Sequence, residues 1–148
     1  MNIVMERMRP EHLDAIAALE TRCFSDPWSR SAIEPELENP LSLWLCAVDG
    51  DTLAGYVGSQ SVLGEADMMN LAVAPEYRRR GIGRALVTEL CDRLIREKQV
   101  HVLTLEVRDS NEAAIALYMS LGFCQVGLRK NYYLRPREDA RILRKELI

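Results

Sequence analysis

Leu-Ala-Val-Ala-Pro-Glu-Tyr-Arg-Arg-Arg-Gly-Ile-Gly-Arg, residues 71–84, is the stretch of sequence that decides the fold. It joins an apolar strand to a basic, glycine-containing turn, and the turn leads into a helix. From Ile82 to Ile95, apolar residues recur at steps of three and four, which predicts an amphipathic helix over residues 81–98. The first amides of such a helix have no partner within it, and its dipole adds about half a positive charge there. The stretch therefore predicts a pyrophosphate-sized anion site.

Two glycines and a run of arginines determine what this turn can bind. Gly81 and Gly83 lack a Cβ, so phosphate oxygens can approach the backbone amides, and positive φ is accessible. Guanidinium groups for charge-assisted hydrogen bonds come from Arg78, Arg79, Arg80 and Arg84. Taken alone, a basic run favours a solvated surface next to an ordinary turn, so the spacing of the glycines has to decide.

The spacing separates this turn from two other phosphate-binding patterns. A P-loop requires G-x-x-x-x-G-K-[ST], which is absent, and a dinucleotide fingerprint requires a third glycine where this chain has Leu86. The pattern Arg78-x-x-Gly81-x-Gly83 after an apolar strand resembles the coenzyme A pyrophosphate loop of the GNAT acyltransferase superfamily. The resemblance implies that the pyrophosphate is bound by Arg79, Arg80, Gly81, Ile82, Gly83 and Arg84. It also implies that backbone groups for the pantetheine amides come from Leu71, Ala72 and Val73.

The composition restricts the class of protein. A chain of 148 residues predicts one domain, residues 1–148, with a substantial core. A net charge of −3 argues against a general nucleic-acid binder. No apolar run is long enough to span a membrane and no signal peptide is evident, which predicts a cytoplasmic protein without a membrane partner. The cysteines have no C-x-x-C spacing, so neither a metal site nor a disulfide framework is indicated. We expect buried, reduced thiols at Cys46, Cys91 and Cys124.

The order of predicted elements favours an α/β fold. Ser31 and Glu34 have the spacing of a capping box, which predicts a short helix there. Strands are expected at 3–8, 41–48, 52–63, 68–73, 100–107, 124–127 and 140–146, and helices at 11–20, 81–98 and 111–121. Early hairpins followed by alternating strands and helices predict one mixed sheet covered by helices.

A second motif follows the strand at 100–107. Asn111 stands at the entry to a helix, where its side chain can cap the first amides. Tyr118 lies seven residues later and faces the same side, and Gly122 is a typical residue after a helix end. Glu106 and Tyr118 could both point into one crevice at the edge of the sheet. Without further context, the pattern favours Tyr118 as an ordinary core aromatic residue, and Glu106 is equally a solvated strand residue.

Several segments extend the resemblance beyond the turn. N-x-x-A-x-x-L-Y-x-x-L-G-F, residues 111–123, closely resembles the last motif of GNAT enzymes. Asp-Pro-Trp-Ser at 26–29, and Asn-Tyr-Tyr at 131–133 ahead of Glu-Asp-Ala at 138–140, are similar to RimI-type enzymes, which acetylate protein N-termini. Arg137 departs from the pattern, because many relatives have glycine there.

The resemblance implies a fold and a chemistry. The fold is a single-domain GNAT fold with a mixed, mostly antiparallel sheet flanked by helices, and the co-substrate is acetyl-CoA, with no metal. Glu106 is expected as general base and Tyr118 as general acid at the coenzyme A thiol, with Asn111 also touching coenzyme A. Trp28 and Tyr132 are expected near the acceptor, a protein N-terminus, and the resemblance points to the N-terminal alanine of ribosomal protein S18.

Elementary acid–base chemistry favours such an acceptor. A terminal α-amine has a pKa of about 7.7 to 8.0, so its deprotonation at pH 7 costs only about 1.4 kcal/mol, against roughly 4.6 kcal/mol for a lysine. We expect the neutral amine to attack the thioester directly in a ternary complex, with backbone amides near Val73 steadying the oxyanion.

Other functions remain open from the sequence alone. A small-molecule amine acetyltransferase shares the same motifs, and a ping-pong enzyme with Cys23 as nucleophile lacks an evident activating histidine. A NAD-dependent oxidoreductase would explain Gly81-Ile82-Gly83 and an acidic residue, Glu106, further along, but not the missing third glycine. A non-catalytic acyl-CoA-binding module is the remaining alternative.

Overall fold

The chain forms one seven-stranded sheet, in the order β1-β2-β3-β4-β5-β7-β6. The computed structural model describes residues 2–148. The strands are β1 (Ile3–Arg7), β2 (Ser42–Asp49), β3 (Thr52–Val62), β4 (Glu65–Val73), β5 (Val102–Arg108), β6 (Cys124–Leu134) and β7 (Arg137–Glu146). The helices are α1 (Leu13–Cys23), α2 (Arg30–Ile33), α3 (Ile82–Lys98) and α4 (Glu112–Ser120), with 3-10 turns η1 (Pro10–His12), η2 (Glu34–Leu37) and η3 (Pro75–Tyr77). The predicted α/β fold with a mixed, mostly antiparallel sheet is confirmed, since only β4 and β5 pair in parallel.

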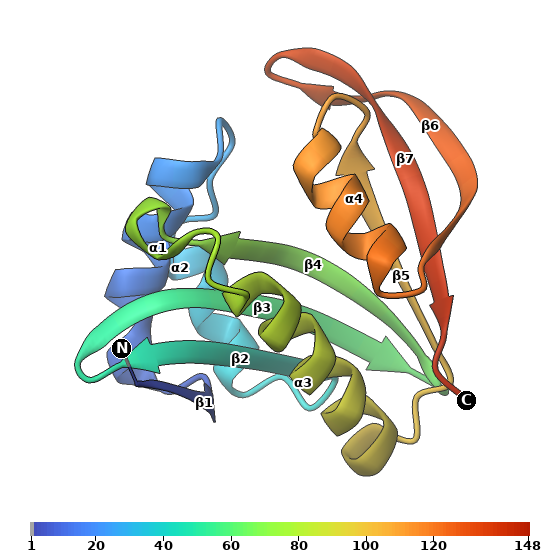
Figure 1. Ribbon diagram of the computed structural model, residues 1–148. Helices are drawn as coiled ribbons and strands as arrows, with labels where there is room; N and C mark the ends of the chain where they lie inside the picture. The colour runs from blue at the N-terminus through green and yellow to red at the C-terminus, as the bar shows by residue number, and fades with distance from the viewer. Residues whose placement is uncertain (1) are drawn as a thin grey trace.

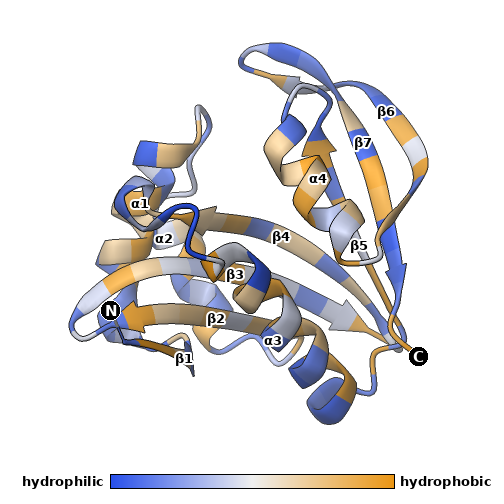
Figure 2. Cartoon of the chain, in the orientation of Figure 1, coloured by the Kyte–Doolittle hydropathy of each residue, from blue (hydrophilic) through white to orange (hydrophobic). Residues whose placement is uncertain are grey.

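The helices cover both faces of the sheet (Figure 1). On one face α3 and α4 pack over a core that includes the fully buried Leu86, Leu90 and Leu94, which recur every four residues along α3. On the other face α1 and α2 cover a second core around Ile16 and Tyr56. The apolar residues along β2 and the hydrophilic last turn of α3 follow from this layering (Figure 2). Burying each such leucine contributes about 1.5–3 kcal/mol, so the helical periodicity of residues 82–95 is what attaches α3 to the sheet.

The sheet separates at its centre. β4 and β5 pair only from Glu65 opposite Val102 to Met68 opposite Leu105, although both strands continue beyond those residues. Figure 1 shows the two strands diverging from the end near the C-terminus of the chain. Past Met68, one edge of β4 therefore has no neighbouring strand.

Some expected boundaries and environments are wrong. The short helix α2 is capped by Ser29, whose side chain accepts from Ala32 N, rather than by Ser31. The thiol of Cys124 is exposed and that of Cys91 is half-buried, whereas Cys46 is buried as expected. Cys124 begins β6 at the edge of the sheet, where no further strand covers it.

The last two strands are longer than expected and form a twisted hairpin. β6 continues to Leu134 instead of ending at Gly127, with irregular pairing near Gly127 and between Arg129 and Tyr133. The alternation of polar and apolar residues breaks at these bulges, so periodicity alone could not reveal the whole strand. Arg137 begins β7 opposite Leu134 and is exposed. Within residues 2–148, none of the helices is both long and apolar enough to cross a membrane.

The close approach of β3 to an aromatic ring predicts a stability effect. A Cβ added at Gly58 would lie 2.4 Å from Trp44 Cε2, and that ring is stacked on Tyr56. We expect Gly58→Ala to lower the free energy of unfolding by roughly 1–3 kcal/mol in urea melts, because a rigid indole cannot move aside. Gly127→Ala is the control, since the tightest contact of its Cβ would be with the flexible Cδ1 of Ile142 at 3.2 Å, and the other two contacts, at 3.8 and 3.9 Å, are ordinary. Equal losses in both variants would contradict this explanation.

Candidate active site

A cleft of about 750 Å³ opens where β4 and β5 separate. It lies between the fourth and fifth of seven strands, so the expected position at the edge of the sheet is wrong. The sequence could not predict this position, because it does not show where the hydrogen bonding between the parallel strands β4 and β5 ends. Of the residues singled out from sequence, the cleft brings together Cys23, Asp26, Trp28, Leu71, Glu106, Asn111, Tyr118 and Tyr132.

Tyr118 lies at the apex of the cleft. Its hydroxyl is 3.8 Å from Met68 Sδ, and Met68 is the last residue of β4 that pairs with β5. The ring packs edge-on against Phe123, with 5.5 Å between the centroids, and only 6% of the residue is exposed. Burial raises the pKa of Tyr118 above its usual value near 10. The residue is thus both a core aromatic and a protonated phenol that lines the cleft.

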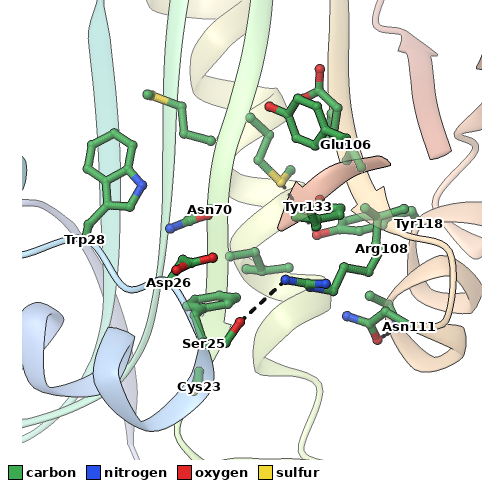
Figure 3. A pocket seen from close by; sticks show the side chains of 18 of the residues that line it. Cys23, Ser25, Asp26, Trp28, Asn70, Glu106, Arg108, Asn111, Tyr118 and Tyr133 are labelled. Atoms are coloured by element: carbon green, nitrogen blue, oxygen red, sulfur yellow. Dashed lines mark hydrogen bonds between the residues drawn. The ribbon is translucent and has the colours of Figure 1, made fainter. Parts of the chain in front are cut away.

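Glu106 reaches the cleft from the opposite face of the sheet. Along β5, Leu105 and Val107 point into the core beneath α3 and α4, so Glu106 between them points to the other side. It directly follows Leu105, the last residue of β5 that pairs with β4. A carboxylate from one face and the phenol of Tyr118 from the other can share one cleft only because the sheet is open here (Figure 3).

The open edge of β4 offers backbone groups to a ligand. In antiparallel pairs, successive residues direct their N–H and C=O groups to opposite sides. Ala74 N donates to Ala54 O at 2.8 Å, so Leu71 and Val73 direct theirs away from β3, towards the open side. Val73 O already accepts from Arg78 Nε at 3.3 Å. The amides of Leu71 and Val73 are therefore placed to donate to an extended molecule lying along β4.

The glycine turn follows this edge directly. Gly81 is the N-cap residue of α3 with φ of 78°, and no side chain caps the helix. Gly83 lies in the first turn of α3 and its φ is not positive, so the backbone conformation at this position does not require a glycine. A Cβ at Gly83 would lie 3.7 Å from Val73 Cγ2 and 3.4 Å from Leu117 Cδ2, which places the turn beside the end of β4 and beside α4.

The side chains around this turn are organised by polar contacts. Arg84 donates to Ser120 Oγ at 2.7 Å, which uses one of the five N–H donors of its guanidinium. The guanidinium of Arg80 lies 5.7 Å from the ring centroid of Tyr77. None of the residues 79–84 lines the cleft itself. The arginines thus surround the helix N-terminus beyond the end of the cleft, where a long ligand would emerge.

Asn111 caps α4, as expected. Its Oδ1 accepts from Ala114 N at 3.2 Å, and the residue also lines the cleft. At the other end of the helix Gly122 has φ of 95°, the left-handed conformation that ends a helix. Both caps hold α4 so that Tyr118 points to the apex.

Arg108 connects the two segments that border the mouth of the cleft. Its guanidinium donates to Pro136 O at 3.0 Å and Arg135 O at 3.1 Å in the β6–β7 turn. It also reaches Ser25 Oγ, 3.5 Å away in the loop after α1 (Figure 3). Ser25 Oγ itself donates to Arg135 O, so the loop and the turn meet over the cleft.

The same guanidinium organises the aromatic wall. It lies 4.2 Å from the centroid of Tyr133, and Tyr133 packs edge-on against Tyr132. Burial raises the pKa of Tyr133 to about 12, and the electrostatic effect of the neighbouring Tyr132 is the second cause. Hydrogen bonds from Ser110 and Arg108 keep the pKa of Glu138 below its usual range. Arg108 was not predicted as a site residue, but the period of two along a strand places it on the same face as Glu106.

Comparisons with known proteins show which family the chain resembles in sequence and fold. The Acetyltransferase (GNAT) family profile matches residues 13–123. The [ribosomal protein bS18]-alanine N-acetyltransferase of Escherichia coli (strain K12) is 42% identical over 134 residues, 88% of each chain. The N-alpha-acetyltransferase RimI of Mycobacterium tuberculosis is 42% identical over 137 residues, 88% of this chain and 84% of that protein. A crystal structure of the ribosomal-protein-S18-alanine N-acetyltransferase from Escherichia coli gives a TM-score of 0.90 at 37% identity, covering 99% of this chain and 94% of that one.

Gly83 offers a test of the predicted pyrophosphate turn. Because its backbone is helical and the space around its Cβ is adequate, Gly83→Ala should leave stability unchanged or raise it by up to about 1 kcal/mol. The added methyl should nevertheless block phosphate oxygens and raise the Kd for coenzyme A by roughly tenfold or more, measured by calorimetry. A variant that is stable and binds coenzyme A as the wild type does would contradict the prediction.

Proposed function

The chain belongs to the Acetyltransferase (GNAT) family, and from this premise we propose that it acetylates the N-terminal alanine of ribosomal protein S18. Acetyl-CoA is the acetyl donor. The proposal includes a single acetyltransferase domain over residues 1–148 and a cytoplasmic location, where ribosomal proteins and acetyl-CoA occur together. The oxidoreductase alternative is set aside by membership of this family.

The meeting of Glu106 and Tyr118 at the point where β4 and β5 separate carries the proposal. In the proposed complex the pantetheine chain lies along the open edge of β4, where the amides of Leu71 and Val73 can donate to it. The pyrophosphate lies at the N-terminus of α3, against the amides of the first turn and the arginines of residues 79–84. This path brings the thioester to the apex, beside the Tyr118 hydroxyl.

The acceptor enters from the face of the sheet covered by α1, where two carboxylates of the cleft lining, Asp67 and Glu106, have no ion-pair partner within residues 2–148. Asp26 also lines the cleft but pairs with Arg135 at 3.9 Å, and the arginine of the lining, Arg108, is engaged with Glu138 at 3.2 Å. This distribution of charge attracts an α-ammonium group. Trp28 and Tyr132 line the same side, at positions suited to the first residues of a peptide.

The proposed reaction is direct transfer in a ternary complex. Glu106 takes a proton from the α-ammonium, directly or through water, and the neutral amine attacks the acetyl carbonyl. Leu71 is nearer along β4 to the apex than Val73, so we expect its open-edge amide to donate to the developing oxyanion. When the carbon–sulfur bond breaks, Tyr118 donates its proton to the departing thiolate. The nitrogen of the new amide loses its second proton, which restores the phenol of Tyr118 through water, and Glu106 returns its own proton to solvent. The products are the acetylated N-terminus, coenzyme A and one released proton.

Two substitutions test the proposed roles. Glu106→Gln and Tyr118→Phe should each lower kcat by roughly 10²–10⁴-fold, because each removes a group that transfers a proton. Free thiol release from acetyl-CoA with an alanine-led peptide measures the rate. Glu89→Gln, in the α3 ion pair with Arg93, and Tyr56→Phe, whose buried hydroxyl has no partner within residues 2–148, serve as controls that should keep full activity. Wild-type turnover in either test variant would refute its assigned role.

The raised pKa of Tyr118 predicts the alkaline side of the pH profile. A general acid must be protonated, and burial moves its deprotonation above the usual value near pH 10. We therefore expect kcat to rise as the α-amine loses its proton and then to stay level to at least about pH 10. A descending limb with a midpoint below that, while the circular dichroism signal is intact, would rule out the assignment.

The identity of the acceptor needs its own experiment. Thiol release should be compared across tetrapeptides that differ only in their first residue, with the N-terminus of S18 among them. We expect the alanine-led S18 sequence to have the highest kcat/KM and an N-terminally blocked peptide with an internal lysine to be inactive. Faster turnover of a small amine such as a polyamine would replace the peptide acceptor with a small-molecule one.

A further inference from the structure

A buried carboxylate behind the cleft has no role in the reaction as proposed above. Glu20 on α1 is only 1% exposed and does not line the cleft. Both of its oxygens accept hydrogen bonds: Oε1 from Trp28 N at 2.8 Å and Oε2 from Asn70 Nδ2 at 2.8 Å. Burying a carboxylate is costly unless its hydrogen bonds are satisfied, so this arrangement requires both donors.

The two partners of Glu20 both face the cleft. Trp28 belongs to the loop after α1 and packs against Trp44, with 5.8 Å between the ring centroids. Asn70 belongs to β4, beyond the last residue that pairs with β5. Figure 3 shows Trp28 and Asn70 across the cleft from Glu106. The carboxylate of Glu20 therefore joins the loop after α1, which holds Trp28, to the part of β4 that does not pair with β5.

Glu20 also determines which way the Asn70 amide points. An ionised carboxylate only accepts hydrogen bonds, so the NH₂ group of Asn70 must face Glu20 and its carbonyl oxygen must face away from it. Within residues 2–148, no N–H or O–H group donates to Asn70 Oδ1. Because Asn70 lines the cleft, this oxygen is available to a donor that enters there.

We propose that Asn70 binds the acceptor by accepting a hydrogen bond from an N–H of the peptide's N-terminal residue, and that Glu20 is the positioning residue that orients it. The inference rests on the proposed peptide acceptor and adds a recognition group to it. A peptide N-terminus suits this site chemically, since its α-ammonium and its first amide are both donors. In the proposed complex acetyl-CoA lies along the open edge of β4 and contacts the backbone amides of Leu71 and Val73, so it does not use this oxygen.

The isosteric substitution Glu20→Gln tests the orientation. The backbone N–H of Trp28 is fixed, so the carbonyl of Gln at position 20 would face it and the new NH₂ would face Asn70. Asn70 would then turn its oxygen towards position 20 and its NH₂ into the cleft. We expect KM for the alanine-led peptide to rise by roughly 10- to 100-fold, while KM for acetyl-CoA changes less than twofold.

A double-mutant cycle separates orientation from simple stabilisation. If Glu20 acts on the acceptor through Asn70, the variant combining Glu20→Gln and Asn70→Ala should have the same peptide KM as Asn70→Ala alone. The reason is that both substitutions remove the same hydrogen bond to the peptide. Glu36→Gln is the control, since Glu36 likewise accepts two hydrogen bonds, here both at Oε1 and from the side chains of Ser42 and Gln60, away from the cleft. It should leave both KM values unchanged even if Tm falls.

The outcomes are distinguishable. Wild-type enzyme that releases no thiol with any peptide would overturn the proposed function itself. Wild-type enzyme that acetylates the peptide, together with an Asn70→Ala variant of unchanged peptide KM, would overturn only the role of Asn70. Additive effects in the cycle, or equal rises in both KM values for Glu20→Gln, would show that Glu20 merely supports the fold. If Glu20→Gln does not fold, the Asn70→Ala measurement still decides whether the oxygen binds the acceptor.

Discussion

The short hydrogen-bonded overlap between β4 and β5 is the constraint on which the rest of the site depends. The strands share only the four pairs from Glu65–Val102 to Met68–Leu105 and then diverge. A closed sheet would seal this region and bury every backbone group in a ladder. Because the ladder stops, one edge of β4 stays unpaired and a cleft penetrates the centre of the sheet.

The open centre lets groups from both faces of the sheet meet. α4 brings Tyr118 from the face covered by α3, and β5 directs Glu106 to the face covered by α1. The unpaired edge of β4 then leads to the N-terminus of α3, where Gly81 begins the helix in a left-handed conformation. One discontinuity thus supplies backbone donors, a phenol, a carboxylate and an anion site along a single path.

Hydrogen bonds from polar side chains connect the segments that border the cleft. Arg108 connects β5 to the β6–β7 turn and to the loop after α1, and Glu20 connects that loop to Asn70 on β4. Each is a charge with several hydrogen bonds, which makes the geometry specific, since charge-assisted bonds are short and directional. The acceptor side is therefore built from ion pairs and amides, whereas the apex around Tyr118 is apolar.

Local sequence determined the elements that depend on periodicity and capping: the amphipathic α3, the Asn111 cap of α4, and the glycine turn between β4 and α3. It also carried the family motifs, because those lie in continuous segments. Tertiary structure alone decided where β4 and β5 part, how far the bulged β6 extends, and which distant side chains meet. Strand periodicity puts Arg108 on the same face as Glu106, but it does not reveal what the guanidinium contacts. The hydrogen-bond partners of Glu20, Asn70 and Arg108 lie between 8 and 83 positions away, and most of them are at least 27 positions away. Contacts at that separation follow from the packing of α1 and the hairpin onto the sheet, and no local pattern records them.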